Sequence, residues 1–131
     1  MAGAYKSLMV VWKAATKSAN ARSQIQFNAD TTDGNYSSMA WQAESTNNSA
    51  STTGLIIDGT PDFGSNAGGY AIFDYCNSST LPVITRDAGG RGTSGAKGVW
   101  HGYAVVDSIN FRSQSGDSYT TGTVKLFGIA G

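Results

Sequence analysis

The residues best suited to chemistry lie in the stretch ADTTDGN, residues 29–35, where two aspartates flank two threonines and precede a glycine. A calcium loop of the EF-hand type needs oxygen ligands at positions 1, 3 and 5, glycine at position 6 and glutamate at position 12. Counted from Asp30, position 5 is Gly34 and position 12 is Trp41, so the pattern fails at the glycine and at the bidentate acid. The Asp33-Gly34 pair is instead typical of a hairpin turn, because glycine accepts a positive φ. We therefore expect a hairpin turn without a required metal, with a weak surface calcium site as the alternative.

Catalytic patterns are weak in the rest of the chain. His101 is the sole histidine and follows Trp100 in an apolar stretch, so we expect it to be structural or exposed rather than a general base. The stretch DAGGRGTSGAKG, residues 87–98, is rich in glycine, but it does not match a phosphate loop and is interpreted as a hairpin loop. No acid lies inside an apolar strand, as a catalytic carboxyl of raised pKa would require. We expect no enzymatic activity and no cofactor.

Composition excludes several broad classes of protein. The 131 residues suit a single domain, residues 1–131. The 9 basic and 9 acidic residues cancel, so the basic excess that marks nucleic-acid-binding proteins is missing. Cys76 is the only cysteine, which excludes an intrachain disulfide, and the apolar run 8–12 is too short for a signal peptide or a membrane span. We expect synthesis in a reducing cytosol, with no nucleic-acid partner and no membrane insertion.

Apolar residues recur in short alternating runs, which predicts strands rather than helices. In residues 23–28, for example, Ile25 and Phe27 share one face and two glutamines share the other. Without helices to cover a sheet, two sheets must bury their apolar faces against each other. We expect an all-β fold, an antiparallel β-sandwich of eight to nine strands of the jelly-roll type. The expected strands span residues 5–14, 23–28, 36–44, 53–59, 69–77, 81–87, 98–106, 108–114 and 123–129.

Several aromatic and charged side chains are candidates for a contact surface. Trp41 shares a face with Met39, and we expect that face to point into the core. Tyrosines beside polar loops are better placed to contact a partner, because their rings combine an apolar body with a polar tip. The candidate surface contacts are Tyr36, Tyr70, Arg91, Lys97 and Tyr119.

Three segments in this order resemble small β-sandwich virion proteins of tailed bacteriophages. The stretch RSQIQFNADTTDGNYSS is similar to a strand–turn–strand pattern of that family, and YAIFDYCNSS is similar to a later strand. The stretch GVWHGYAVVDSINFRSQSGDSYTTGTVKLFGI resembles the family's closing section. The residues that match the first pattern are Ile25, Phe27, Asn28, Asp30, Asn35 and Tyr36, and those of the ending are Gly122, Thr123, Leu126, Phe127, Gly128 and Ile129.

The resemblance implies a structural role in the virion and no catalytic residues. The favoured role is a capsid decoration or cement subunit, or an accessory tail or fibre subunit. The implied partners are other virion proteins, such as the major capsid protein or tail proteins, after synthesis in the host bacterial cytoplasm. The alternative from another class is a carbohydrate-binding module that recognises a host surface glycan.

Unprotected strand edges indicate self-association. Edge strands are normally blunted by charge or proline, but residues 123–129 offer one lysine and no proline, and the run 8–12 offers neither. Identical chains usually cover such edges in closed symmetric assemblies. The residues do not set the number of copies. The resemblance implies threefold symmetry, so we expect a homotrimer.

Overall fold

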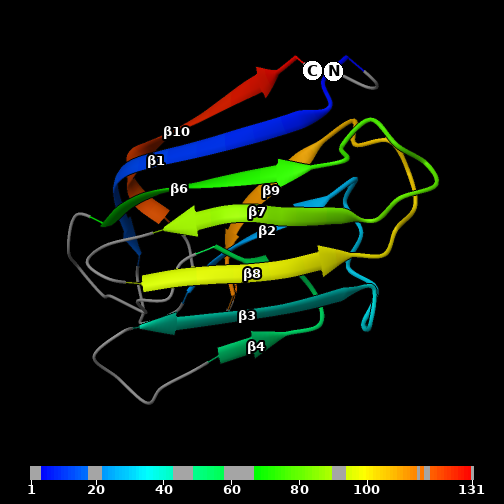
Figure 1. Ribbon diagram of the computed structural model, residues 1–131. Helices are drawn as coiled ribbons and strands as arrows, with labels where there is room; N and C mark the ends of the chain where they lie inside the picture. The colour runs from blue at the N-terminus through cyan, green and yellow to red at the C-terminus, as the bar shows by residue number, and fades with distance from the viewer. Residues whose placement is uncertain are drawn as a thin grey trace.

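The computed structural model describes residues 4–17, 22–42, 49–57, 67–89, 94–114, 116 and 119–130. These residues form ten strands and no helix, in an all-antiparallel arrangement (Figure 1). The expected all-β class is confirmed, with ten strands where eight or nine were predicted. The strands are β1 (Ser7–Lys17), β2 (Ser23–Phe27), β3 (Tyr36–Gln42), β4 (Ser49–Ser51), β5 (Leu55–Ile56), β6 (Ala67–Asp74), β7 (Val83–Gly89), β8 (Ser94–Trp100), β9 (Ile109–Ser113) and β10 (Tyr119–Ile129).

The strands form one large and one small sheet. The large sheet has seven strands in the order β10-β1-β6-β7-β8-β3-β4, and the small sheet has three in the order β5-β2-β9. In Figure 1, β2 and β9 of the small sheet lie behind the large one, and β10 and β4 are its two edges. The first and last long strands, β1 and β10, are therefore neighbours, although more than 100 residues separate them in sequence.

Alternation along each strand decides which side chains the two sheets enclose. In β1, Leu8, Val10 and Trp12 are buried, whereas Met9 and Val11 between them lie on the outer face and are half-buried. Both sheets contribute to the resulting core. Its members are Leu8, Val10, Trp12, Ile25, Phe27, Tyr36, Ala40, Leu55, Ile56, Ile57, Ala71, Phe73, Cys76, Val83, Ala88, Ala96, Trp100 and Val106.

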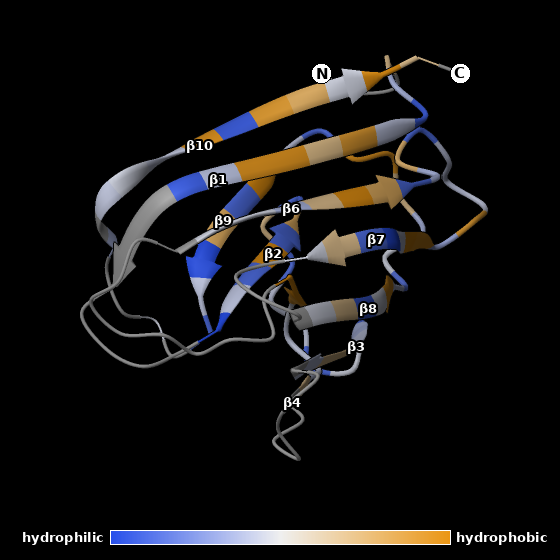
Figure 2. Cartoon of the chain, turned by 60° about the vertical axis from the view of Figure 1, so that its left-hand side comes forward, coloured by the Kyte–Doolittle hydropathy of each residue, from blue (hydrophilic) through white to orange (hydrophobic). Residues whose placement is uncertain are grey.

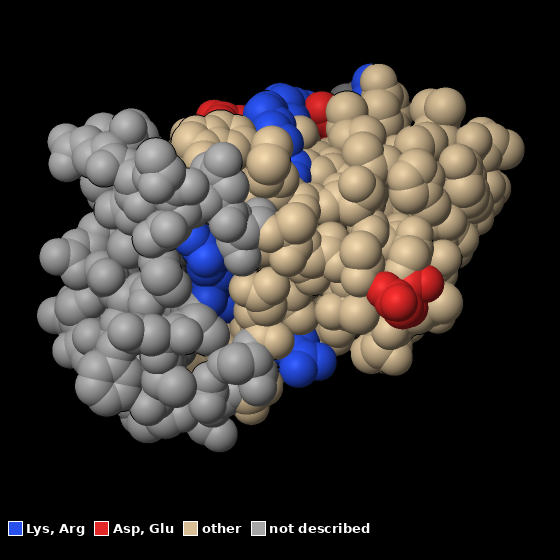
Figure 3. Space-filling model, turned by 90° about the horizontal axis from the view of Figure 1, so that it is seen from below, with Lys and Arg blue, Asp and Glu red and all other residues tan. Residues whose placement is uncertain are grey.

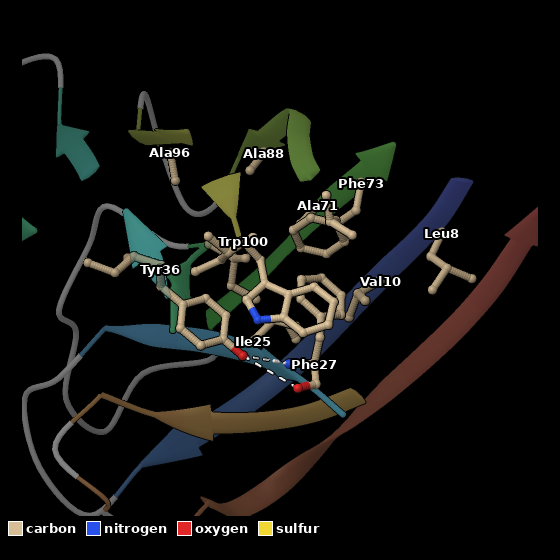
Figure 4. Close-up of a cluster of buried hydrophobic side chains, with 14 of the residues drawn as sticks. Leu8, Val10, Ile25, Phe27, Tyr36, Ala71, Phe73, Ala88, Ala96 and Trp100 are labelled. Atoms are coloured by element: carbon tan, nitrogen blue, oxygen red, sulfur yellow. Dashed lines mark hydrogen bonds between the residues drawn. The ribbon is translucent and has the colours of Figure 1, made fainter. Parts of the chain in front are cut away.

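Aromatic rings join the two sheets at the centre of this core (Figure 4). Phe27 of the small sheet meets Phe73 of the large sheet edge-on, with ring centroids 5.2 Å apart. Phe27 also packs against Trp100 at 5.3 Å, and Trp100 stacks on Tyr36 at 6.3 Å. Such pairs contribute beyond the area they bury, because ring edges and faces carry opposite partial charge.

The predicted hairpin around Asp33 and Gly34 is wrong in its pairing and correct in its turn. Asn35 N–H donates to the Thr32 carbonyl at 3.2 Å, and Gly34 has φ of 87°, so Asp33 and Gly34 do occupy a tight turn. The strands on either side are not partners, since β2 belongs to the small sheet and β3 to the large one. The segment is a loop that crosses from one sheet to the other.

Two other local predictions are corrected by the structure. The strand expected at residues 98–106 ends at Trp100, because the Trp100 ring lies against Gly102 and Tyr103 has φ of 49°, which no strand residue adopts. Trp41 does share a face with Met39, but that face is the outer one, and Met39 is 50% exposed. By contrast, the hairpin predicted at residues 87–98 agrees with the antiparallel pairing of β7 and β8, although residues 90–93 lie outside the described residues.

Candidate functional site

The outer edge of β10 lacks a strand partner. β10 pairs with β1 along one side, and no strand of the described residues pairs with its other side. An edge strand of this kind presents N–H and C=O groups that another chain can bind. The pairing with β1 is uninterrupted from Thr123 to Ile129 and becomes irregular beside Gly122, whose φ is 117°. The regular edge is therefore seven residues long.

β10 is rich in apolar residues (Figure 2), and it exposes apolar side chains on both of its faces. Val124 and Leu126 lie opposite Trp12 and Val10 and so continue the core-facing side of the sheet, yet they are 44% and 38% exposed. Phe127 points to the outer face and is 44% exposed. β10 thus continues the apolar, core-facing side of β1 beyond the part of the large sheet that the small sheet covers.

The other edges of the two sheets are protected in ordinary ways. β4, at the opposite end of the large sheet, has only three residues, Ser-Ala-Ser. β5 has two residues, and β9 places Asn110 and Arg112 along its length. Short strands and charged side chains are the usual devices against edge-to-edge pairing. Figure 3 shows the molecule from the β4 side, where charged side chains of both signs are scattered among the described residues. Among the described edges, β10 is the one left long and apolar.

The aspartate of the opening motif is a structural group in the loop between β2 and β3. One Asp30 oxygen accepts hydrogen bonds from Trp100 Nε1 at 2.7 Å and Asn35 Nδ2 at 2.9 Å, and the other accepts from Thr32 N–H at 2.9 Å. Burial alone would raise the pKa of Asp30, but these donors outweigh it and lower the pKa to about 2. Within the described residues, no group of three or more His, Cys, Asp or Glu side chains is placed to hold a metal.

Tyr36 is a core residue, which corrects its prediction as a surface contact. It is 1% exposed, and Figure 4 shows its hydroxyl pointing at Phe27. The hydroxyl accepts from Phe27 N–H at 3.0 Å and donates to the Asp30 carbonyl at 2.9 Å. Burial raises the pKa of Tyr36 to about 12. The polar loop beside Tyr36 in sequence folds over it, so proximity to polar residues did not mean exposure.

The other predicted contact residues are dispersed. Tyr70 is 39% exposed on the outer face of β6, and its hydroxyl donates to Asp87 at 2.8 Å. Lys97 is exposed on β8, where its ammonium donates to the Arg86 carbonyl. Tyr119 is half-buried against Phe111, with its hydroxyl 2.5 Å from Ser23 Oγ. Arg91 lies outside the described residues. These side chains do not converge on one site.

The two groups that most resemble catalytic residues are also separate. Cys76 is buried in the core, and burial raises the pKa of its thiol to about 12, so it is not a thiolate at neutral pH. His101 is exposed after the end of β8, with its Nδ1 3.5 Å from the Tyr103 hydroxyl. Cys76 and His101 make no contact with each other in the structure described.

An aromatic pair on the outer face was not foreseen from sequence. Trp41, Gly95, Gly89 and Tyr70 lie in one cross-strand row over β3, β8, β7 and β6. A Cβ placed on Gly95 would lie 2.7 Å from the Trp41 ring, and one on Gly89 would lie 3.3 Å from the Tyr70 ring. The Trp41 ring therefore lies over Gly95 and the Tyr70 ring over Gly89, so each ring extends from its own strand toward the other. Only the strand register could reveal this row, because its members are scattered over more than 50 residues of sequence.

The comparisons with known proteins give no family for the chain: no family model, curated protein or solved structure matches it. Among the described residues, no helix has the length and hydropathy needed to cross a membrane.

Proposed function

We propose that this protein is a non-enzymatic structural subunit of a tailed-phage virion, a capsid decoration or accessory tail subunit that binds its neighbours through the open edge of β10. The observation that carries the proposal is the seven-residue segment from Thr123 to Ile129. Its outer edge has no partner strand among the described residues, and it exposes apolar side chains on both faces. The resemblance to phage virion domains supports the assignment to a particle. The finer fold class belongs to the same proposal: the two sheets form a β-sandwich, and its jelly-roll type stays a prediction.

A structural subunit explains the distribution of polar groups. The loop between β2 and β3 satisfies its own carboxylate, and the exposed predicted contacts are scattered instead of forming a cleft. A protein that works by being joined to others needs a stable core and an open edge, and both are present. Self-association and binding of a capsid or tail protein would use the same edge, since either supplies a partner strand.

Localisation on the particle tests this role. Labelled protein is mixed with separated heads and tails of the phage that encodes it, and bound protein is measured by co-sedimentation. We expect saturable binding to one fraction, weakened by Leu126→Lys on the edge. Leu81, which is 47% exposed before β7, gives the matched control Leu81→Lys. Absence of the wild-type protein from both fractions would contradict the virion role.

Glycan binding is the second candidate function, and the Trp41–Tyr70 row favours it. Flat aromatic rings offer an apolar surface to the face of a sugar ring, and the Asp87 carboxylate beside Tyr70 is a hydrogen-bond acceptor. Calorimetry against neutral oligosaccharides tests this function, with Trp41→Ala as the test variant and Tyr103→Ala as the control. Saturable binding lost only in Trp41→Ala would favour the glycan-binding role. Its absence would leave the aromatic pair a structural cover for the two glycines.

A further inference from the structure

A second copy of this chain fits the β10 edge by symmetry. When an edge strand pairs antiparallel with its own copy, a twofold axis perpendicular to the sheet relates the two strands. Each face of the sheet then continues across the junction, so core-facing residues oppose core-facing residues and outer residues oppose outer residues. The axis must therefore pass beside a residue that opposes itself. Within the regular edge the centred possibilities are Val124, Lys125, Leu126 and Phe127.

The length of the regular edge selects one of these registers. Residues 123–129 are symmetric about Leu126, so an axis there pairs all seven positions of one strand with all seven of the other. An axis at Val124 would instead extend the pairing through the irregular backbone at Gly122, and an axis at Phe127 would leave Thr123 and Val124 without a partner residue inside the strand. The Leu126 register uses the whole straight segment.

Charge selects the same register. An axis at Lys125 would place two lysines directly opposite each other, and like charges directly opposite are destabilising. With the axis at Leu126, Lys125 instead opposes the exposed ring of Phe127, where an ammonium can lie over the aromatic face. The two Lys125 side chains become diagonal neighbours, roughly 7–8 Å apart, where solvent screens them.

The core-facing side of the junction becomes a continuous apolar strip. Leu126 meets its own copy, and Val124 lies opposite Gly128 of the second copy. The ring of Tyr5, which is 40% exposed, lies over Gly128. Each Val124 would therefore be covered by a Tyr5 ring from the second copy. Three exposed apolar side chains of each chain lose water in one contact, which is the main driving force in protein association.

We propose that two copies of this protein pair through antiparallel β10 strands around a twofold axis at Leu126, joining their large sheets into one. A twofold pair differs from the threefold assembly that the resemblance implies, so mass in solution separates the two. The pairing can be tested without a virion, and its failure would leave the virion role to be decided by the co-sedimentation experiment.

The first experiment measures mass by light scattering across a dilution series. We expect twice the 13.6 kDa of the chain at high concentration, falling toward 13.6 kDa on dilution. Leu126→Lys places two lysines opposite each other at the axis and should abolish the dimer, whereas the control Leu81→Lys should not. A monomer at every concentration, or a threefold mass, would overturn the proposal.

The second experiment reads the register with single cysteines. Directly opposite residues lie about 4.5–5.5 Å apart between Cα atoms, which a disulfide can span. Leu126→Cys should therefore form a covalent dimer on mild oxidation. Val124→Cys is the matched control, because Val124 shares the face of Leu126 and has similar exposure, yet two Val124 residues lie four positions out of register. The native Cys76 is buried and gives the wild-type baseline. Cross-linking of Val124→Cys in place of Leu126→Cys would overturn the register.

Discussion

The core beside the loop between β2 and β3 and the outer edge of β10 differ in how their polar and apolar groups are partnered. Around Trp100 the indole N–H, the Asp30 carboxylate and the Tyr36 hydroxyl all find partners within the chain. Along β10, one side of the backbone has no partner strand among the described residues, and Val124, Leu126 and Phe127 stay 38–44% exposed. The first region is complete within one chain, and the second leaves an outer strand edge open among the described residues. We therefore expect substitutions around Trp100 to change the stability of the fold, and substitutions on β10 to change the binding of other chains.

Truncation of Trp100 should have the largest effect on stability. Trp100→Ala removes a 2% exposed side chain that packs on Phe27 and Tyr36 and leaves Asp30 short of a donor. We expect the free energy of unfolding to fall by about 3–5 kcal/mol. Urea unfolding at neutral pH measures this change. A loss below about 1 kcal/mol would show that the loop end does not organise the core.

Acid should destabilise the protein through Asp30. Its folded pKa of about 2 lies below the ordinary value of 3.8, so the ionised form is favoured by folding. The shift corresponds to about 2 kcal/mol, and because water screens this partly exposed carboxylate we expect about 1–2 kcal/mol. This stability is fully present above the unfolded pKa and is lost as pH falls through the folded pKa. Measurements of the unfolding free energy at a series of pH values from about 6 to about 2 check the prediction.

The control for the acid prediction is Asp30→Asn. The amide cannot ionise, so the part of the acid-dependent loss that belongs to Asp30 should vanish in this variant. If Asp30→Asn and the wild type lose the same unfolding free energy at low pH, the loss belongs to other carboxyl groups. Asp74 is one of these, since its hydrogen bond from Arg86 also lowers its pKa.

A matched pair of tryptophan substitutions compares a satisfied indole with an unsatisfied one. Trp12 is 1% exposed, and within the described residues its Nε1 has no hydrogen-bond partner, whereas Trp100 Nε1 donates to Asp30. Trp→Phe removes similar volume at both positions. Trp100→Phe should therefore cost about 1–3 kcal/mol more than Trp12→Phe, because only the former leaves a charged acceptor short of a donor. Equal losses in thermal or urea unfolding would contradict this reasoning.

The smallest effect on stability is expected on β10. Val124→Thr keeps the β-branched shape and changes only an exposed position, so the unfolding free energy of the monomer should shift by less than about 0.5 kcal/mol. The same variant should weaken self-association, because Val124 would be covered by a Tyr5 ring in the dimer. The two readouts are urea unfolding at high dilution and light scattering at high concentration. A large loss of monomer stability would place the edge within the core.

Sequence alternation by itself determined the strand content, and the Asp33-Gly34 pair determined the tight turn. It paired Ile25 with Phe27 and Met39 with Trp41 on common faces, and both pairings hold in the structure. A period of two fixes which residues share a face, because successive side chains point to opposite sides. These features depend only on neighbours within one strand.

The tertiary structure decided which of those faces is buried and which strands pair. Tyr36 is buried and Trp41 lies on the outer face, because β3 turns its even-numbered residues toward the small sheet. Gln24 and Gln26 are buried as well, since loop residues pack over their side of β2, with Gln26 Nε2 donating to the Thr53 carbonyl at 2.8 Å. Strand order likewise makes β10 an outer edge among the described residues. It corrects the prediction that the run 8–12 is an open edge, because β1 lies between β10 and β6. Period-two alternation determines neither the buried face nor the strand order, because the pattern is unchanged when a strand is turned over or moved to another sheet.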